Sequence, residues 1–466
     1  MNQNTLVLTI GFLLGACSCS AGSAEKDSFS RSHQDRFAPE TTAETTTETT
    51  SLAETVLNDT VEVSETYTPQ CTPLPLRTLA AVPDETFDLG PYLMSMTETS
   101  VTVLWRTLES ADGRVLYRLP GEEAEESVDG SSAATVHEIT LSGLLPGTLY
   151  EYRVETGGNS SQVHEFMTAP TAENGFRFLV WGDNQNGPEV FGQLVSAMLT
   201  QGSHMLVGVG DHVQEGKKAE LFKDQLFGPG RALFHQVPFF AAMGNHEQNA
   251  STWYQLFSYP AADVPVDPYN ESYYSYTFGN TFFLVINTNT IIVPVGDTDT
   301  PISAWIREQV NSPAAQAATW RVAYAHEPAI TESWSAGDCK YDGYLQIREF
   351  VMPLLAESGF HLYFSGHTHA YERSMMDGVV HIISGGGGGG LDEWCKDFEQ
   401  TSVVYQNHHF LRVDAGCEGL RVEAVNLAGD VVDWVELDAS NYGLIVDEGP
   451  APGLPDLIIS ADSPEK

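Results

Sequence analysis

The chain has 466 residues, and its 22 Lys and Arg against 63 Asp and Glu give a formal net charge of −41 at pH 7. This length suits more than one domain, and 42% hydrophobic and 10% aromatic residues are typical of a globular protein. The negative charge argues against binding nucleic acid by bulk electrostatics. No apolar run reaches the roughly 20 residues of a membrane-spanning helix, so we do not expect an integral membrane protein.

The first residues have the features of an export signal. Residues 6–16 are the longest apolar stretch and have the length of a signal-peptide core. They end in LGAC at residues 14–17, which resembles a bacterial lipobox, where lipid is attached to the cysteine. We therefore expect residues 1–16 to be a signal peptide and Cys17 to be lipidated, although residues 1–5 contain no Lys or Arg. An ordinary secretory signal is the alternative.

This signal predicts an exported protein. It would be a cell-envelope lipoprotein, periplasmic or on the outer surface, that touches the membrane only through its anchor, or else a secreted protein. Residues 17–75 are predicted to form a disordered linker, because the Thr/Glu-rich run at 41–48 and the scarcity of aromatic residues leave little to bury.

Six cysteines are consistent with export into an oxidising compartment. Cys339 and Cys395 both lie in Gly- and Asp-rich segments, and a bridge between these loops is the first expectation. The pairing of the other cysteines stays open, and one thiol of the five after Cys17 is left over.

Residues 76–170 have the pattern of short β-strands. Alternating segments such as 100–106 (SVTVLWR) and 148–154 (TLYEYRV) are separated by turn residues, which suggests a β-sandwich. Residues 139–154 (ITLSGLLPGTLYEYRV) resemble a fibronectin type III module, and Trp105 fits the core of such a sandwich. We expect this domain to be a scaffold, with His137 and His164 as ordinary strand residues.

From residue 174 to 440 the pattern changes to apolar strands that alternate with helical stretches, followed by a C-terminal tail at 441–466. Five of the apolar runs are followed by metal-ligand residue types. These runs are 176–181, 205–209, 237–243, 321–325 and 361–365. The polar residues after them are Asp183, Asp211, Asn245 with His246, His326, and His367 with His369.

Side chains at the carboxyl ends of strands in an α/β sheet can converge on one site. Carboxylate, amide and imidazole donors together suit Mn²⁺, Fe²⁺ or Zn²⁺. A single Gly-Asp or His-x-His would be weak evidence, but five such groups at strand ends predict a metal centre.

The order GD, GD, GNHE, H and GHTH resembles the calcineurin-like metallophosphoesterase superfamily. Residues 366–373 (GHTHAYER) are similar to a block of the purple acid phosphatases within it. The resemblance covers roughly residues 76–440. It implies an α/β fold class, with an N-terminal fibronectin III-like β-sandwich before a four-layer α/β/β/α sandwich.

The resemblance also implies two divalent metal ions and a role for each residue. Asp211 would bridge the two ions. Asp183 and His369 would hold one of them, and Asn245, His326 and His367 the other. Such a pair can clamp a phosphoryl oxygen and supply a hydroxide nucleophile. His246 would bind phosphate or protonate the leaving group, with support of its ligand neighbour as the alternative.

Two positions depart from the family pattern. Purple acid phosphatases have an iron-binding Tyr three residues after the second Asp, where this chain has Gln214, and non-purple relatives have a His where it has Gln185. An amide oxygen from either Gln could substitute as a neutral ligand. We therefore expect a colourless enzyme that prefers divalent ions.

The loop from Glu327 to Gly343 lacks the substrate-contacting His residues of plant-type relatives. It offers Glu332, Asp338, Lys340, Tyr341 and Asp342 instead. The run of six glycines at 385–390 is expected to let the backbone pass close to the metal centre or to support a flap. His212 and one of His408 and His409 are expected to lie behind the ligands.

The sequence thus predicts a metal-dependent phosphoric monoester hydrolase acting on a small-molecule phosphate ester, with no nucleic-acid partner. One alternative is a phosphodiesterase or nucleotide pyrophosphatase on the same metal core. The other is a surface-binding protein in which the metal site is structural.

Overall fold

The computed structural model describes residues 71–81, 84–260, 270–290, 300–439, 444–449 and 457–459. The predicted signal peptide, Cys17, Cys19 and residues 17–70 of the predicted linker lie outside these residues. Within the described part, no helix is long and apolar enough to cross a membrane.

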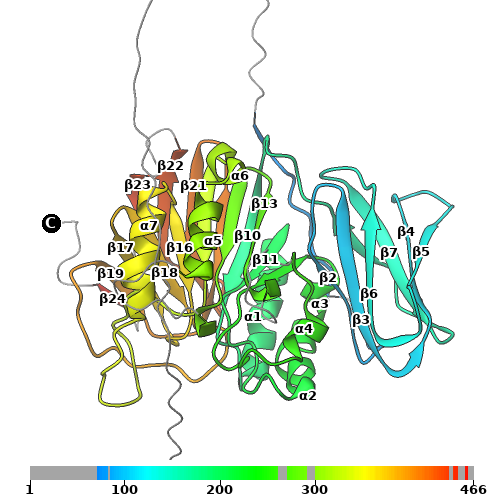
Figure 1. Ribbon diagram of the computed structural model, residues 1–466, viewed down its shortest axis with the longest axis horizontal. Coiled ribbons are helices and arrows are strands. Elements are labelled where there is room, and N and C mark those ends of the chain that lie inside the picture. The colour runs from blue at the N-terminus through cyan, green and yellow to red at the C-terminus, as the bar shows by residue number, and fades with distance from the viewer. Residues whose placement is uncertain are drawn as a thin grey trace, which may run out of the picture. The chain divides into compact units, whose positions relative to one another are not determined.

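Two eight-stranded sheets form the centre of the α/β body that follows the N-terminal domain (Figure 1). The first sheet contains β1 (Thr72–Pro73), β10 (Asn174–Trp181), β11 (Met205–Gly208), β12 (Phe239–Ala241), β20 (His409–Ala415), β21 (Gly419–Asn426), β22 (Val431–Asp438) and β23 (Leu444–Glu448). Its order is β12-β11-β10-β20-β21-β22-β23, with β1 paired to β10. Strands β10, β11 and β12 are parallel, so their carboxyl ends lie at one edge.

The second sheet contains β13 (Tyr274–Phe278), β14 (Thr281–Val285), β15 (Trp320–Tyr324), β16 (Leu362–Ser365), β17 (Tyr371–Met376), β18 (Val379–Ser384), β19 (Thr401–Tyr405) and β24 (Leu457–Ile459). Its order is β13-β14-β15-β16-β18-β17-β19-β24. Strands β14, β15, β16 and β18 are parallel. Both sheets therefore have a parallel group whose ends can carry a site.

The helices cover the outer faces of these sheets (Figure 1). They are α1 (Pro188–Gln201), α2 (Ala219–Leu221), α3 (Arg231–Phe234), α4 (Trp253–Leu256), α5 (Pro301–Val310), α6 (Pro313–Ala317) and α7 (Met352–Glu357). Two π-helical turns, η1 (Phe222–Phe227) and η4 (Ile347–Val351), and two 3-10 turns, η2 (Asn270–Ser272) and η3 (Thr288–Thr290), complete them.

Side-chain alternation in β14 shows how the layers form. Phe283 points to the inner face, where its ring meets Phe178 of the first sheet at 5.5 Å between centroids. Its neighbours Phe282 and Leu284 point outward into a separate core with Trp305 of α5. A strand buried on both faces is the rule for a parallel sheet covered by helices. The expected four-layer α/β/β/α arrangement is confirmed.

The N-terminal domain is a sandwich of two antiparallel sheets. One contains β2 (Leu89–Met94), β3 (Ser100–Ala111) and β6 (Ala134–Ser142). The other contains β4 (Gly113–Arg118), β5 (Glu126–Asp129), β7 (Leu149–Thr156), β8 (Asn159–Ser160) and β9 (His164–Met167). Trp105 is fully buried as expected, and its indole N–H donates to Thr156 Oγ1 at 2.9 Å.

The sandwich is joined to the α/β body by buried polar contacts. The phenol of Tyr92 donates to the carbonyl of Leu256 at 2.8 Å, and the phenol of Tyr152 donates to that of His235 at 2.7 Å. His164, which the sequence presents as an ordinary strand residue, contacts the ring of His235 at 4.2 Å between centroids. These contacts attach the sandwich to α4 and to the residue that follows α3.

Short paired segments also lie in the predicted linker and in the predicted tail. Cys71 forms a disulfide with Cys417, and β1 adds residues 72–73 of the predicted linker to the first sheet. At the other end, β23 and β24 add residues of the predicted tail to the two sheets. The expected bridge between Cys339 and Cys395 is present. Short paired segments of this kind have too few residues to be recognised from periodicity.

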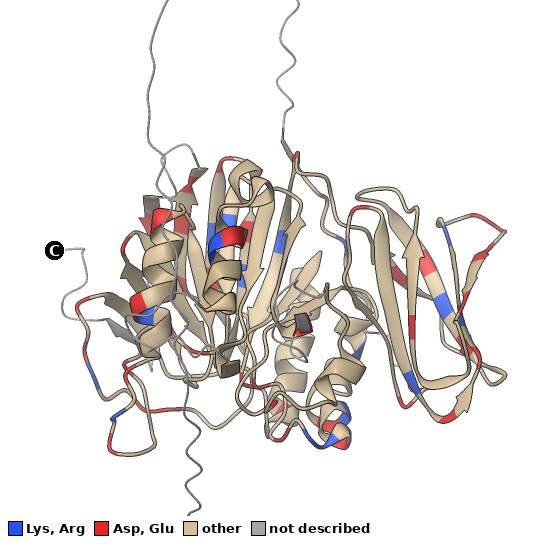
Figure 2. Cartoon of the chain, in the orientation of Figure 1, with Lys and Arg blue, Asp and Glu red and all other residues tan. Residues whose placement is uncertain are grey.

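The acidic residues are spread over the whole body. Figure 2 shows Asp and Glu on both the sandwich and the α/β body, with Lys and Arg interspersed among them. Several pair locally, as Arg118 does with Glu151 at 2.7 Å and Arg106 with Asp88 at 2.7 Å. Among the described residues, the acidic positions are therefore spread over both domains.

A buried contact between a carboxylate and an imidazole at the domain junction predicts a measurable pH dependence. Asp84 Oδ2 lies 2.9 Å from His164 Nε2, and both side chains are 1% exposed. Burial by itself would raise the pKa of Asp84, but hydrogen bonds from His164, Thr86 and Gln162 outweigh it and hold that pKa well below the ordinary 3.8. A depressed pKa stabilises the fold above the pKa of the unfolded carboxyl and loses that contribution as the pH falls below it.

We expect Asp84→Asn to lower the stability by about 1–3 kcal/mol near neutral pH, because it weakens these buried hydrogen bonds. The difference from the wild type should narrow as the pH falls from about 6 to about 3. Denaturant unfolding of both proteins across this range measures it, with exposed Asp112→Asn as the control. A gap that stays constant or widens on acidification would contradict the prediction.

Candidate metal centre

The predicted ligand residues follow the parallel strands of both sheets. Asp183 comes two residues after β10, Asp211 three after β11 and Asn245 four after β12. From the second sheet, His326 comes two residues after β15 and His367 two after β16. The two sheets thus contribute ligand-type side chains from the same kind of strand end.

The backbone at three of these positions is left-handed. The φ angles of Asp183, Asp211 and His367 are 60°, 52° and 69°. Non-glycine residues adopt this region rarely, and such strain collects at functional sites. Here it turns each side chain sharply out of the strand direction.

Glycines leave room for the carboxylates. A Cβ at Gly244 would lie 2.2 Å from Asp211 Oδ1, and one at Gly366 would lie 2.2 Å from Asp183 Oδ2. No side chain fits at that distance, so the glycine before Asn245 and the one before His367 are required by close approach.

Four candidate ligand atoms meet in one cluster. His326 Nε2 lies 3.1 Å from Asp211 Oδ2, 3.0 Å from Asn245 Oδ1 and 3.2 Å from His367 Nδ1. His367 Nδ1 is also 2.9 Å from Asn245 Oδ1. Ligand atoms held at ~2.0–2.1 Å from one tetrahedral ion lie about 3.3 Å apart. The residues therefore fit a transition-metal ion.

The histidine tautomer also suits a ligand. His326 Nδ1 lies 2.9 Å from the carbonyl oxygen of Val209, so this nitrogen carries the hydrogen and donates it. Nε2 then presents its lone pair to the cluster. A backbone carbonyl behind a ligand imidazole is the usual way in which its orientation is fixed.

A second group lies beside the first. His369 Nε2 is 3.5 Å from Asp183 Oδ1 and 3.1 Å from Gln185 Nε2, and His369 Nδ1 is hydrogen-bonded to the carbonyl of Gly390. Gln185 Oε1 is buried and has no hydrogen-bond partner. The carboxylate of Asp183, the imidazole of His369 and an amide side chain with an unpaired buried oxygen are donor types that suit a second cation.

Gln214 is engaged elsewhere. Its side-chain oxygen accepts a hydrogen bond from Asn186, and its backbone N–H donates to Gln225 Oε1 at 2.8 Å. Of the two glutamines that the sequence offers as substitute ligands, Gln185 is therefore the one whose side chain contacts the other candidate ligands.

The electrostatics of the cluster require a positive charge. Burial favours a neutral His326, but the carboxylates of Asp211 and Asp183 outweigh it and raise the pKa of His326 well above its ordinary 6.5. Burial would raise the pKa of Asp211, yet His326 and His246 lower it to about 2. Two buried carboxylates at this point thus need a proton or a cation, which agrees with the donor geometry.

His246 lies at the rim of the cluster. Its Nδ1 is 2.8 Å from the carbonyl oxygen of Gln214, and its backbone N–H donates to Asp211 Oδ1 at 2.7 Å. The side chain is 31% exposed, and Nε2 lies 3.9 Å from Asp211 Oδ2. Nε2 is therefore the nitrogen that can exchange a proton near the ligands.

Sequence reasoning missed the role of Glu247. This fully buried carboxylate accepts hydrogen bonds from the backbone N–H groups of Asp211 at 3.0 Å, His212 at 2.7 Å and Gly244 at 2.7 Å. It holds the left-handed turn at Asp211 against the turn before Asn245. Its place at the end of the GNHE block, directly after Asn245 and His246, could have indicated this role.

The loop after His326 offers polar side chains whose roles the sequence leaves open. Glu332 is buried and accepts hydrogen bonds from Trp394 Nε1 at 2.9 Å and Phe398 N at 2.5 Å, so it anchors the loop. Lys340 is 80% exposed and lies 3.6 Å from Asp338. The residues of this loop that contact His367 are Glu327, Trp334 and Tyr341. No sequence pattern pointed to the first two.

The other predicted neighbours are placed as follows. His212 is buried behind Asp211, with Nδ1 at 3.1 Å from Asn184 Oδ1. His409 is buried and His408 half-buried, with His408 Nδ1 at 3.1 Å from the carbonyl of Gly386. The glycine run passes close to the ligands, since a Cβ at Gly389 would lie 2.9 Å from the His369 ring.

Two family models match the chain. Residues 176–371 match the model described as calcineurin-like phosphoesterase, and residues 92–168 match the N-terminal domain of purple acid phosphatases. Residues 176–371 are therefore a calcineurin-like metallophosphoesterase domain, which follows a purple acid phosphatase N-terminal domain. The family prediction is confirmed, and the sandwich likened to fibronectin type III is the domain that purple acid phosphatases have at this position.

Curated relatives agree with this family. Purple acid phosphatase 15 of Arabidopsis thaliana is 23% identical over 304 residues, covering 55% of this chain and 54% of that protein. Purple acid phosphatase 18 of the same plant is 24% identical over 323 residues, covering 65% and 69%. The metallophosphoesterase chain thus spans about half the length of the first of these relatives.

Solved structures share the fold. Purple acid phosphatase PPD1 from yellow lupin (Lupinus luteus) seeds superposes with a TM-score of 0.65 at 17% identity, covering 78% of this chain and 77% of that one. A structure of PhoD gives 0.59 at 13% identity, covering 79% and 93%. At these identities the likeness concerns the fold alone.

Proposed function

We propose that the chain is a dinuclear, divalent-metal-dependent phosphoric monoester hydrolase that acts on small-molecule phosphate esters. The single observation that supports it most is the cluster of four ligand atoms from Asp211, Asn245, His326 and His367. They follow strand ends of both sheets, and four of the distances between these atoms are 2.9–3.2 Å.

In this proposal Asn245, His326 and His367 hold one ion, Asp183 and His369 hold the other, and Asp211 bridges them. Gln185 is the additional ligand, because its oxygen is buried without a partner. Two such ions, when bound, supply Lewis-acid stabilisation of the phosphoryl oxygens and a nucleophile derived from water. With Gln214 in the position of the family's Tyr, the loaded enzyme is expected to be colourless, with Mn²⁺, Zn²⁺ or Fe²⁺ in both sites.

His246 is the proposed proton donor to the leaving group. Its Nδ1 is occupied by the carbonyl of Gln214, which orients Nε2, and the side chain is solvent-accessible next to Asp211. An imidazole with one nitrogen fixed and the other free at the rim can give a proton to a departing alkoxide.

We expect the purified protein to bind close to two divalent ions per chain and to hydrolyse 4-nitrophenyl phosphate in a chelator-sensitive manner. Asp211→Ala should abolish turnover and lower the metal content while keeping the fold, because it removes the shared ligand. Exposed Asp224→Ala, which removes a carboxylate from η1, is the matched control. Metal analysis, circular dichroism and a phosphate-release assay measure these effects.

The same assay separates the rival functions. Faster turnover of bis-4-nitrophenyl phosphate than of the monoester would favour a phosphodiesterase or nucleotide pyrophosphatase. Bound metal with no turnover of either ester, whichever ion is added, would overturn the proposal in favour of a structural metal site in a binding protein.

The role of His246 predicts a substrate-dependent loss of activity. We expect His246→Ala to lower kcat for an alkyl ester such as glycerol 2-phosphate by about 10²-fold or more, because an alkoxide needs a proton to leave. The loss should be much smaller for 4-nitrophenyl phosphate, whose leaving group is stable as an anion. Equal losses on the two esters would instead assign His246 to phosphate binding or to support of Asn245.

We further propose that the protein is exported and anchored through Cys17. The two disulfides, Cys71–Cys417 and Cys339–Cys395, support an oxidising compartment. A lipidated cysteine followed by a polar linker would hold the catalytic body away from the membrane that carries it.

Cell fractionation tests the anchor. In a bacterial host that processes lipoproteins, we expect the full chain to sediment with membranes and Cys17→Ser to become soluble, since the acyl chains are lost. Cys19→Ser is the control and should stay with the membranes. A Cys17→Ser protein that fractionates like the wild type would reject lipid anchoring and leave a plain secretory signal.

A further inference from the structure

We infer that Glu327 and Tyr341 position His367 so that it ligates a metal ion through Nδ1. This inference rests on the proposed metal centre and names two further residues of it. Neither residue supplies an atom to the cluster, so both act through the imidazole.

The tautomer of His367 is the starting point. Its Nδ1 faces the cluster, at 2.9 Å from Asn245 Oδ1 and 3.2 Å from His326 Nε2. A neutral imidazole that ligates through Nδ1 must carry its hydrogen on Nε2. Glu327 Oε2 lies 3.4 Å from this Nε2, and the two side chains are only 14% and 15% exposed. The carboxylate therefore selects the Nε2–H form and leaves Nδ1 free to bind.

Glu327 is itself held in place. The phenol of Tyr341 donates to the same Oε2 atom at 2.5 Å. The phenol of Tyr363 donates to the backbone carbonyl of Glu327 at 2.7 Å. The carboxylate thus has a fixed position. A group must be held in this way before it can orient a metal ligand.

Aromatic rings restrict the His367 imidazole further. Trp334 lies over it with 5.2 Å between centroids and 29° between planes, and Tyr341 meets it at 5.0 Å and 70°. Trp334 and Tyr341 also contact each other at 4.6 Å. Rotation of the imidazole by half a turn would have to disturb this packing, so the rings oppose the exchange of Nδ1 and Nε2.

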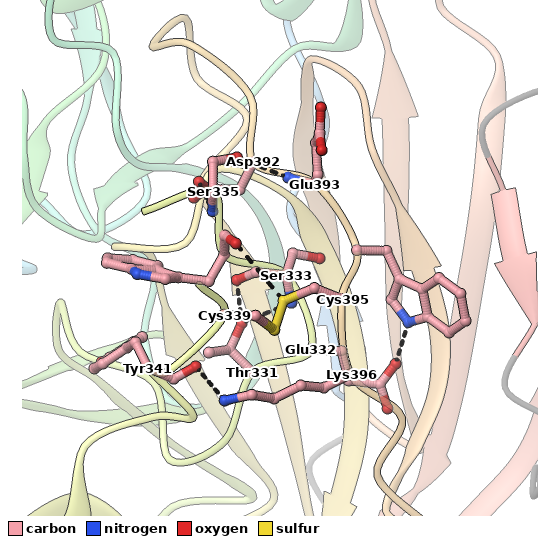
Figure 3. The surroundings of a disulfide bond; sticks show 12 residues. Thr331, Glu332, Ser333, Ser335, Cys339, Tyr341, Asp392, Glu393, Cys395 and Lys396 are labelled. Carbon is pink, nitrogen blue, oxygen red and sulfur yellow. Dashed lines mark hydrogen bonds between the residues drawn. A yellow bond between two sulfur atoms is a disulfide. The ribbon is translucent and has the colours of Figure 1, made fainter. Parts of the chain in front are cut away.

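The loop that carries these residues is pinned to a second loop. Figure 3 shows Cys339 bonded to Cys395 with Tyr341 nearby, and Lys396 Nζ donates to the carbonyl of Tyr341 at 2.6 Å. The backbone of Cys395 also donates to the carbonyl of Glu332 at 2.9 Å. These links keep the Tyr341 phenol within reach of Glu327.

Glu327 and Tyr341 are expected to act on only one of the two proposed ions, the one that His367 holds. His326 obtains its orientation from the carbonyl of Val209, and His369 from the carbonyl of Gly390. His367 has a carboxylate instead, which also strengthens the imidazole as a donor. Removal of that carboxylate should therefore weaken the ion held by His367 and spare the ion held by Asp183 and His369.

Metal affinity tests this without relying on catalysis. In the full chain, competition with a chromophoric chelator measures the two Zn²⁺ dissociation constants of the wild type, Glu327→Gln and Tyr341→Phe. We expect Glu327→Gln to weaken one site by about 10–100-fold and to leave the other near the wild-type value. Tyr341→Phe keeps the ring but loses the O–H, and should weaken the same site by a smaller factor.

The matched control is Glu349→Gln, which removes a carboxylate that is 54% exposed on η4 and should change neither constant. Unchanged Zn²⁺ affinities in Glu327→Gln would overturn the inference. Equal weakening of both sites together with a lower melting temperature of the metal-free variant would also overturn it, in favour of a general packing role. Hydrolysis of 4-nitrophenyl phosphate by the wild type, followed in parallel, reports separately on the proposed function.

Discussion

The whole site depends on one constraint, which is that parallel strands of two facing sheets end in sharply turned loops at the same place. Asp183, Asp211 and His367 leave their strands through left-handed backbone conformations. Each such conformation is unfavourable by itself and persists only when its surroundings determine it. Glu247 stabilises the turn at Asp211, because its carboxylate accepts hydrogen bonds from the backbone N–H groups of both Asp211 and Gly244.

The meeting of these strand ends also has an electrostatic consequence. Buried carboxylates packed this closely repel one another. Without a metal ion, the chain offsets this repulsion through His326, whose pKa Asp211 and Asp183 raise although burial lowers it. A cation of higher charge satisfies the same carboxylates better than a proton on one imidazole. The strained turns, the required glycines and the buried charge therefore occur together at one place, and all three fit a bound cation.

The surrounding structure keeps this edge rigid. The sandwich is attached by the phenols of Tyr92 and Tyr152, and the Cys71–Cys417 disulfide ties the start of the described chain to the first sheet. On the open side, the Cys339–Cys395 disulfide pins the loop that holds Tyr341 against Glu327. Loops that carry functional groups on a firm scaffold are the general pattern of α/β enzymes.

Sequence patterns were enough to predict the family resemblance, the four layers and the residues that could be ligands, because apolar strands followed by Gly, Asp, Asn and His have a local signature. How these residues are used could be read only from the folded chain. Gln185 rather than Gln214 contacts the ligands, Glu332 is buried as an anchor, and Glu327 stands behind His367. These outcomes depend on contacts between loops that are distant in the sequence. No local pattern encodes such contacts, since the distances are fixed only when both sheets have packed.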